Sequence, residues 1–376
     1  MAENLGSFRG NEGVRQVLAS LPLVECEDGV FRKPASVHVP TDRVRAILTD
    51  PKCLARLPEK NSGPVADVLR WLGVFDEVRE ELVVDMVRAM SRSSPTAASK
   101  LWIAEILLYV QRHVHRQQKL PTALEELRRF AWVPARHDQQ IWSRPDRIHA
   151  AFRDYLIGRA APVLDLPLAV QKECSEALGF LGVITSPATE VVVDHLKRSA
   201  AAGDKVHGEV YTFLSEHCKD RAVRDLKKLD CIDIAGPEDP PRYVSAANLF
   251  WAEHPFGNFR HTLSRELRRF QPLFDTLGVK EQPTFEDALA ILDECSSAAS
   301  SQVLEEVPTE VREATEGAWR LLGVALATGA CSAENLAGLR GKSCIASIGG
   351  RLLRPSDMLL EDRAGVVDRL PKESRD

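Results

Sequence analysis

Apolar and polar positions follow an order that returns four times along the chain. A few apolar residues lead into a short extended segment, a turn and a second extended segment, which a proline or a small residue closes. The first copy spans residues 21–34 and contains Asp28-Gly29, a pair whose two turn positions favour positive φ. Pro34 ends the second segment, because proline has no N–H for a strand ladder. The pattern predicts a small β-hairpin.

Three further segments show the same order of apolar and turn positions. They are residues 131–145 with a turn at 137–140, residues 231–244 with a turn at 236–241, and residues 344–355 with Gly349-Gly350. Their aligned β-branched residues, with that of the first copy, are Val24, Val133, Ile232 and Ile345, at intervals of 109, 99 and 113 residues. Because a two-stranded hairpin is marginal alone in water, we expect large side chains to anchor each hairpin against helices. These anchors are Phe31, Trp132, Trp142, Tyr243 and Leu352.

The triplet Leu-Gly-Val is a second landmark and follows each of the first three hairpins. It occupies residues 72–74, 181–183 and 277–279, at intervals of 109 and 96. Glycine there suits a left-handed cap at the end of a helix. Such triplets also arise by chance, and one at residues 322–324 breaks the spacing. Two unrelated landmarks nevertheless keep one order and nearly one period, which indicates a genuine repeat.

Helices are predicted between the hairpins, two after each triplet and a short third one before the next hairpin. Their ranges are 75–91, 96–117 and 122–130, then 188–201, 204–218 and 220–229, then 284–296, 308–328 and 333–340, with a last short helix at 359–368. Leu124, Leu127 and Phe130 share one face at the 3.6-residue period. Thr284 and Asp287 fit a capping box. The serine- and alanine-rich residues 296–301 resemble a linker.

The predicted fold class is mainly α with small β-hairpins (α+β), arranged as a tandem repeat array of about four diverged hairpin-plus-helices units. The predicted units are residues 1–118, 119–218, 219–330 and a partial unit at 331–376. Repeat arrays usually carry polar capping repeats, and neither end of this sequence has the pattern of a complete cap. We therefore expect the chain to be a piece of a longer protein or to pair with another chain.

Composition narrows the class of protein. Hydrophobic residues make up 44% and charged residues 27%, which is typical of a folded chain. A net charge of -5 gives no overall attraction to phosphate backbones or anionic membranes. The eight cysteines contain no C-x-x-C pair, so buried free thiols in a reducing compartment are expected. With no signal-peptide pattern or stretch of about 20 apolar residues, the prediction is cytoplasmic and not membrane-bound.

No nucleotide-binding motif fits the sequence. Gly341-Lys342-Ser343 resembles the end of a P-loop, but Leu336 stands where that motif needs a glycine. Gly349-Gly350 is better interpreted as a hairpin turn than as a phosphate cradle. The sequence contains no G-x-G-x-x-G and no G-x-S-x-G.

Histidine and arginine clusters are the remaining candidates for chemistry. His113 and His115 lie two residues apart and so on different helix faces, which favours a solvated basic helix end beside Arg112, Arg116 and Lys119 over a phosphate or acidic-partner patch. On a predicted helix at 263–270, Arg265, Arg268 and Arg269 share a face, and nucleic-acid contact is the alternative to a solvated surface. His217-Cys218 and Glu253-His254 lack a third partner. We predict no catalytic, cofactor-binding or metal residues, no cofactor and no enzymatic activity, although a site assembled from distant residues stays open.

The motifs together resemble the repeat region of sacsin and of bacterial sacsin-like proteins. The resemblance lies in Trp132-Val133-Pro134 with Pro145, in residues 351–355 with Ser356-Asp357-Met358, and in Leu277-Gly278-Val279 with Pro283-Thr284 and Asp287. It implies a chaperone-type or scaffold role beside an ATPase domain related to the ninety-kilodalton heat-shock chaperone. The nucleotide-binding motifs of that domain are not recognisable here.

The sequence thus predicts a non-catalytic helical repeat scaffold that binds protein partners or clients, with an upstream ATPase domain or a companion chain as a further partner. The alternative is a nucleic-acid-contacting component of a bacterial anti-phage defence system, which the family resemblance also implies. A salt-dependent gel shift would favour the alternative.

Overall fold

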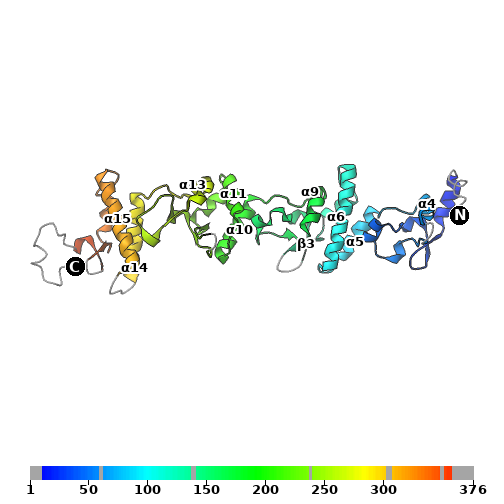
Figure 1. Cartoon of the computed structure of the whole chain (residues 1–376), viewed down its shortest axis with the longest axis horizontal. Helices are drawn as coiled ribbons and strands as arrows, with labels where there is room; N and C mark the ends of the chain where they lie inside the picture. Colours follow the sequence, from blue (N-terminus) through cyan, green and yellow to red (C-terminus); the bar gives the residue numbers. More distant parts are fainter. Residues whose placement is uncertain are drawn as a thin grey trace, which may run out of the picture. The chain divides into compact units, whose positions relative to one another are not determined.

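A computed structural model describes residues 11–58, 62–136, 141–236, 239–301, 307–347 and 351–357. The chain divides into two compact units, Met1–Ala188 and Thr189–Asp376. Both are mainly helical and carry small, separate sheets (Figure 1). The predicted fold class, mainly α with small β-hairpins, is confirmed. The predicted turns at 137–140 and Gly349-Gly350, part of the turn at 236–241, and the helix at 359–368 lie outside the described residues.

The first unit contains two short β-ribbons among its helices. In chain order its elements are α2 (Glu12–Ser20), β1 (Val24–Glu25), β2 (Phe31–Arg32), α3 (Asp42–Ile47), α4 (Ser62–Leu72), α5 (Glu80–Met90), α6 (Ala97–Gln117), the 3₁₀ helix η4 (Leu124–Arg128), β3 (Val133–Arg136), β4 (Ile141–Ser143), α7 (Asp154–Ile157), β5 (Val163–Leu164), α8 (Leu168–Glu173) and α9 (Ser175–Leu181). β5 joins the second ribbon as a third strand in the order β4-β3-β5, which the sequence pattern did not predict.

The second unit repeats this alternation of helices and ribbons. Its elements are α10 (Thr189–Ala202), α11 (Gly208–Glu216), α12 (Arg221–Arg224), η7 (Asp225–Lys228), β6 (Ile232–Asp233), β7 (Tyr243–Val244), β8 (Leu249–Phe250), β9 (His261–Thr262), η10 (Arg265–Phe270), α13 (Gln271–Leu277), α14 (Phe285–Ser301), α15 (Thr309–Ala327), η11 (Ala337–Leu339), β10 (Ile345–Ala346) and β11 (Leu352–Leu353). The pair β8–β9 is parallel.

All four predicted hairpins form antiparallel ribbons, and they share one register. We call them ribbon 1 (β1–β2), ribbon 2 (β3–β4), ribbon 3 (β6–β7) and ribbon 4 (β10–β11). The aligned β-branched residues pair as Val24 with Arg32, Val133 with Ser143, Ile232 with Val244 and Ile345 with Leu353. Two residues after each second partner a 3₁₀ turn begins: η2 (Pro34–Ser36), η5 (Pro145–Arg147), η8 (Ala246–Asn248) and η12 (Pro355–Asp357).

The turn of ribbon 1 differs from the predicted two-residue type. Of its residues only Gly29 has a positive φ, of 80°. The Cys26 N–H donates to the Val30 carbonyl at 3.0 Å, so the loop holds three residues and ends with glycine in the left-handed region, a common three-residue hairpin. The Asp28 carboxylate accepts from the Val30 N–H at 3.1 Å. Aspartate therefore stabilises the turn through its side chain rather than through a positive φ.

The three in-phase Leu-Gly-Val triplets end α4, α9 and α13 as predicted. Gly73, Gly182 and Gly278 have φ angles of 94°, 94° and 98°. The N–H of each following valine donates back to a carbonyl five residues earlier, at 2.9 Å in all three copies, which is the Schellman cap. The fourth triplet, at residues 322–324, lies inside α15, so its break in the spacing has a structural basis.

Several predicted helix boundaries are wrong. α5 begins at Glu80 rather than 75, because Phe75 pairs as extended backbone with residues 37–39. Residues 296–301 are no linker: they complete α14, where the Ser297 hydroxyl donates to the Asp293 carbonyl at 2.8 Å. The third helices are mostly 3₁₀, as in η4, η7 and η11. In α14 the Asp287 carboxylate accepts from the Thr284 N–H at 2.8 Å, which is the reciprocal half of the predicted capping box.

Candidate functional site

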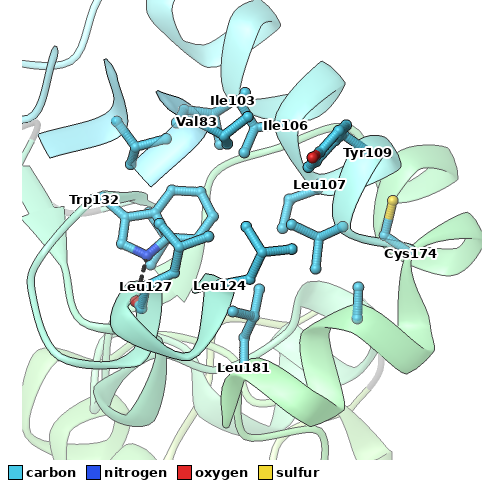
Figure 2. Close-up of a cluster of buried hydrophobic side chains, with 14 of the residues drawn as sticks. Val83, Ile103, Ile106, Leu107, Tyr109, Leu124, Leu127, Trp132, Cys174 and Leu181 are labelled. Carbon is cyan, nitrogen blue, oxygen red and sulfur yellow. Dashed lines mark hydrogen bonds between the residues drawn. The ribbon is translucent and has the colours of Figure 1, made fainter. Parts of the chain in front are cut away.

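The outer face of ribbon 2 is buried beneath the two helices that precede it. Trp132, one residue before the aligned Val133, is 0% exposed and lies among Val83 of α5 and Ile103 and Ile106 of α6 (Figure 2). Its indole N–H donates to the Leu127 carbonyl at 2.7 Å, so the ring is buried without an unpaired polar atom. Trp132 is the anchor that the sequence predicted.

A second aromatic residue ties ribbon 2 to the loop between the same helices. Trp142 lies opposite Pro134 in the ribbon, and it is half-buried against the core of the first unit. Its indole N–H donates to the Ser93 carbonyl, which lies between the end of α5 and the start of α6. The helix pair α5–α6 therefore holds the ribbon at both tryptophans.

Ribbon 3 is held by its preceding helices in the same way. Cys231, which corresponds to Trp132, is 1% exposed, and its carbonyl accepts from the Tyr211 hydroxyl of α11 at 3.0 Å. Tyr243 corresponds to Trp142. Its hydroxyl donates to the Asp204 carbonyl at 2.7 Å, in the loop between α10 and α11. Different side chains thus make equivalent contacts.

Ribbon 4 repeats the contact at its first position. Cys344 is 0% exposed, and its carbonyl accepts from the Trp319 indole of α15 at 2.7 Å. Leu352 packs, partly buried, against the cluster formed by α14 and α15. The predicted anchoring by Leu352 is therefore confirmed, together with that by Trp142 and Tyr243.

Ribbon 1 is the exception among the four. Leu23 and Phe31 occupy the positions of Trp132 and Trp142, yet they are 39% and 57% exposed. The prediction that Phe31 anchors its hairpin is wrong, because no helix pair of the described chain precedes and covers this ribbon. Val17, Leu21 and Val30, in and before the same hairpin, are exposed as well.

After each of the first three ribbons, the backbone forms a hydrogen bond with the residue that follows Leu-Gly-Val. The N–H groups of Val39, Ala150 and Trp251 donate to the carbonyls of Phe75, Ile184 and Lys280, at 2.8, 2.9 and 3.0 Å. The residues just before these donors accept in turn. The carbonyls of His38, His149 and Phe250 accept from Ala55, Leu164 and Leu263, at 2.9, 2.8 and 2.9 Å. We call these sites junctions 1, 2 and 3.

Two buried histidines, His38 and His149, lie at junctions 1 and 2, and neither was predicted from the sequence. In the described structure, both ring nitrogens of His38 lack a hydrogen-bond partner, and so does the Nδ1 of His149. Burial lowers the pKa of both rings from the usual 6.5, because a desolvated imidazole disfavours its charged form. The signal in the sequence was their spacing: each follows Pro34 or Pro145 by four residues, and Phe250 follows Ala246 equally.

The predicted basic end of α6 is only partly solvated. His113 is buried, its Nδ1 lies 3.0 Å from the Tyr109 carbonyl, and its ring lies 4.2 Å from that of Tyr109. The prediction of a solvated site is therefore wrong for His113, although His115 is exposed. Arg116 forms an ion pair with Glu77 at 3.0 Å. The structure does not gather these groups into one phosphate-binding cluster.

The arginines at 265–269 lie on a 3₁₀ helix rather than an α-helix. Residues three apart share a face of such a helix, so Arg265 and Arg268 still do, and Arg269 does not share it as predicted. Arg268 pairs with Glu281 at 2.9 Å and lies over the Trp251 ring, while Arg269 lies over the Phe270 ring. Both side chains therefore contribute to packing within the second unit.

The other residues singled out in the sequence lie apart from one another. The His217 Nδ1 is 2.8 Å from the Phe213 carbonyl, and His254 stacks on Phe256. Lys342 pairs with Asp293 of α14. Among the described residues no group of three potential metal ligands occurs, and no described helix is long and apolar enough to cross a bilayer.

All eight cysteines are free, and six of them are buried. Burial raises the pKa of Cys174 and of Cys231 to about 12, which keeps these thiols protonated and unreactive. Cys53 and Cys218 are half-buried. The predicted buried free thiols are thus confirmed for six positions.

Two depressions lie on the first unit. One, of about 590 Å³, is mainly polar and is lined by charged residues of both signs, including Glu80, Lys119 and Arg128. The other, of about 380 Å³, is mainly apolar and is lined by α3, α5 and α6, including Met86, Met90 and Trp102.

The chain matches no protein-family model, no curated protein and no solved structure.

Proposed function

We propose that this protein is a non-catalytic helical repeat scaffold that binds partner or client proteins, in the manner expected of a sacsin-like repeat region. Its unit would be a ribbon, a junction, a helix that ends in Leu-Gly-Val and a pair of helices that covers the next ribbon. A companion ATPase, as a domain or a separate chain, would be a partner of such a scaffold. Cytoplasmic location is part of the proposal.

One observation carries the proposal: the shared register of the four ribbons, joined to equivalent junction bonds in three places. Repeat modules of this kind bury most of their contact surface against neighbouring modules. The surface that stays exposed is then available to bind partner proteins. Exposed apolar side chains beside charged ones, as Leu23 and Phe31 beside Glu25 in ribbon 1, are typical of a protein-contact surface.

The test is a client-holding assay on the full chain. Light scattering would follow the heat-induced aggregation of citrate synthase with increasing amounts of this protein, with and without ATP. The proposal expects stoichiometric suppression that does not depend on ATP. Absence of suppression at a molar excess, or release of phosphate from ATP by the purified chain, would contradict it.

Nucleic-acid contact is tested in parallel on the same preparation. A gel shift of mixed-sequence duplex DNA at low and high salt reports on backbone binding, since such binding weakens steeply with salt. The proposed scaffold predicts no shift at either salt concentration. A shift that disappears at high salt would favour the defence-component alternative instead.

A further inference from the structure

The outer face of ribbon 1 lacks the cover that the equivalent faces have. At the first position the exposed fraction is 39% for Leu23, against 0% for Trp132, 1% for Cys231 and 0% for Cys344. At the second position Phe31 is 57% exposed, whereas its counterparts are half-buried. Burying these two side chains would remove apolar surface from water, which is the main driving force of association.

Helix α2, which precedes ribbon 1, corresponds to the short third helix that precedes ribbons 2 and 3. It packs against α4 and the 3₁₀ turn η2, just as η4 packs against α9 and η5, and η7 against α13 and η8. Leu18 of α2 lies against Leu72, at the end of α4. α2 therefore takes the place of the third, short helix, and the described chain has no helix pair in front of it.

We propose that the outer face of ribbon 1 is a docking surface for a pair of α-helices carried by a partner protein. The other three ribbons define what fits there: two successive helices with an apolar side against the first position of the ribbon. Two of those pairs also donate an aromatic N–H or O–H to the first-position carbonyl, from Tyr211 to Cys231 and from Trp319 to Cys344. The Leu23 carbonyl holds the same place.

The surroundings of the face suit a protein partner. Charged side chains lie beside the apolar ones: Glu25, opposite Phe31 in the ribbon, pairs with Arg56 at 2.8 Å, and Asp28 of the turn pairs with Arg32 at 2.7 Å. Protein interfaces combine apolar residues with charged groups at their edge. A second copy of this chain does not fit, since each described helix pair already covers its own ribbon. This inference rests on the proposed function, because it treats α2 as the end of a module.

The experiment supplies a helix pair to the face by duplication. Residues 1–129 are joined to Leu21 of residues 21–376, so that α5, α6 and η4 precede a second copy of ribbon 1 at the spacing they have before ribbon 2. Phe31→Cys is placed in that second copy, and iodoacetamide labelling is followed peptide by peptide. We expect labelling about tenfold or more slower than for Phe31→Cys in the natural chain, since it then requires local opening. Equal rates would overturn the proposal.

The internal control is Phe31→Cys in the first copy of the duplicated chain, which should react as fast as in the natural chain. If that duplication fails to fold, residues 189–228, which contain α10 to η7, take the place of residues 1–20, with the same readout. Sedimentation of the natural chain over a wide concentration range should show a monomer. A dimer that Phe31→Glu abolishes would assign the face to a second copy and overturn the proposal. The client-holding assay is read separately, so slow labelling of the Phe31→Cys thiol in the second copy without client holding contradicts only the proposed function.

Discussion

Ribbons 1 and 2 have the same register, the same following 3₁₀ turn and equivalent junctions, yet they differ in what lies on their outer faces. Trp132 is enclosed by α5 and α6, whereas Leu23 at the same position is exposed. The backbone of a ribbon therefore does not depend on a covering helix pair. Its stability in ribbon 1 comes from the inner face, where Val24 and Cys26 join the cluster formed with Val74.

This difference separates two kinds of contact. The inner face and the junction hold a ribbon against the segments that follow it, while the outer face contacts the helices before it where these are present. Substitutions at equivalent positions can separate the two, because the two ribbons lie in one unit and can be compared in one unfolding measurement.

The largest expected difference is between Trp132→Ala and Leu23→Ala. Removing the buried indole should lower the free energy of unfolding by about 3–5 kcal/mol, because it leaves a cavity and an unpaired Leu127 carbonyl. The same change at Leu23 should cost less than about 1 kcal/mol. Urea denaturation, followed at the unfolding transition of the first unit, measures the loss of stability in both variants. Similar losses from the two variants would mean that ribbon 1 is covered as ribbon 2 is.

Acid should destabilise junctions 1 and 2 alike. Burial lowers the pKa of His38 and His149, with Arg79 adding to the effect at His38, so the folded unit binds fewer protons than the unfolded chain. Their contribution is fully present above the unfolded pKa of about 6.5 and is lost as pH falls below it, by at most about 1.4 kcal/mol per pH unit for each ring.

His38→Phe tests this, because Phe250 already occupies the third position. The variant should keep its stability at neutral pH and lose part of the fall in unfolding free energy between about pH 7 and pH 5. An identical slope in His38→Phe and the natural chain would show that His38 does not differ in protonation between the folded and unfolded states.

Substitutions at the glycine caps should change stability by a smaller amount, and a glycine inside a helix provides a matched control. Gly73 has a φ of 94° and Gly323 lies within α15, and an added Cβ would meet no atom within 4 Å at either position. Gly73→Ala should cost about 1–2 kcal/mol, because a Cβ is strained in the left-handed region. Gly323→Ala should instead stabilise its unit by about 0.5–1 kcal/mol. Thermal unfolding distinguishes the two, and a loss at Gly323 equal to that at Gly73 would contradict the assignment of caps.

The smallest expected effect concerns the aromatic contact to the helix loop. Tyr243→Phe removes the hydroxyl that donates to Asp204 and should cost about 0.5–1 kcal/mol. Phe31→Tyr adds a hydroxyl at the exposed equivalent and should change stability by less than about 0.5 kcal/mol. Equal losses from both would indicate that the ribbon 1 face is already occupied in solution.

Local signals predicted the ribbons, the caps and most helices. The register of the four ribbons was predictable from one β-branched residue in each first strand, namely Val24, Val133, Ile232 and Ile345. Each of these residues precedes its turn and its closing proline or small residue by similar intervals. Leu-Gly-Val predicted a left-handed cap because glycine alone adopts that φ without strain. The parallel pairing of His38 with Phe75 escaped prediction, since it is a bridge of single residues far apart in the chain and leaves no periodicity.

The candidate interface was predicted only in part. Trp132 and Trp142 are large side chains in a marginal hairpin, which was enough to expect burial. Phe31 met the same criterion and is exposed, because burial there depends on whether another element covers it. Composition misled at residues 296–301, where serine and alanine suggested a linker but the α-helix continues through them.

Hydrogen exchange at the junctions tests the central claim most directly. The backbone amides of Val39, Ala150 and Trp251 should each exchange only through unfolding of the unit that contains them, because each makes the same bond to the residue after Leu-Gly-Val. Protection of each amide at the level set by unfolding of its own unit would support like-built modules. An amide among them that exchanges as fast as a free peptide, while its neighbours stay protected, would contradict the account.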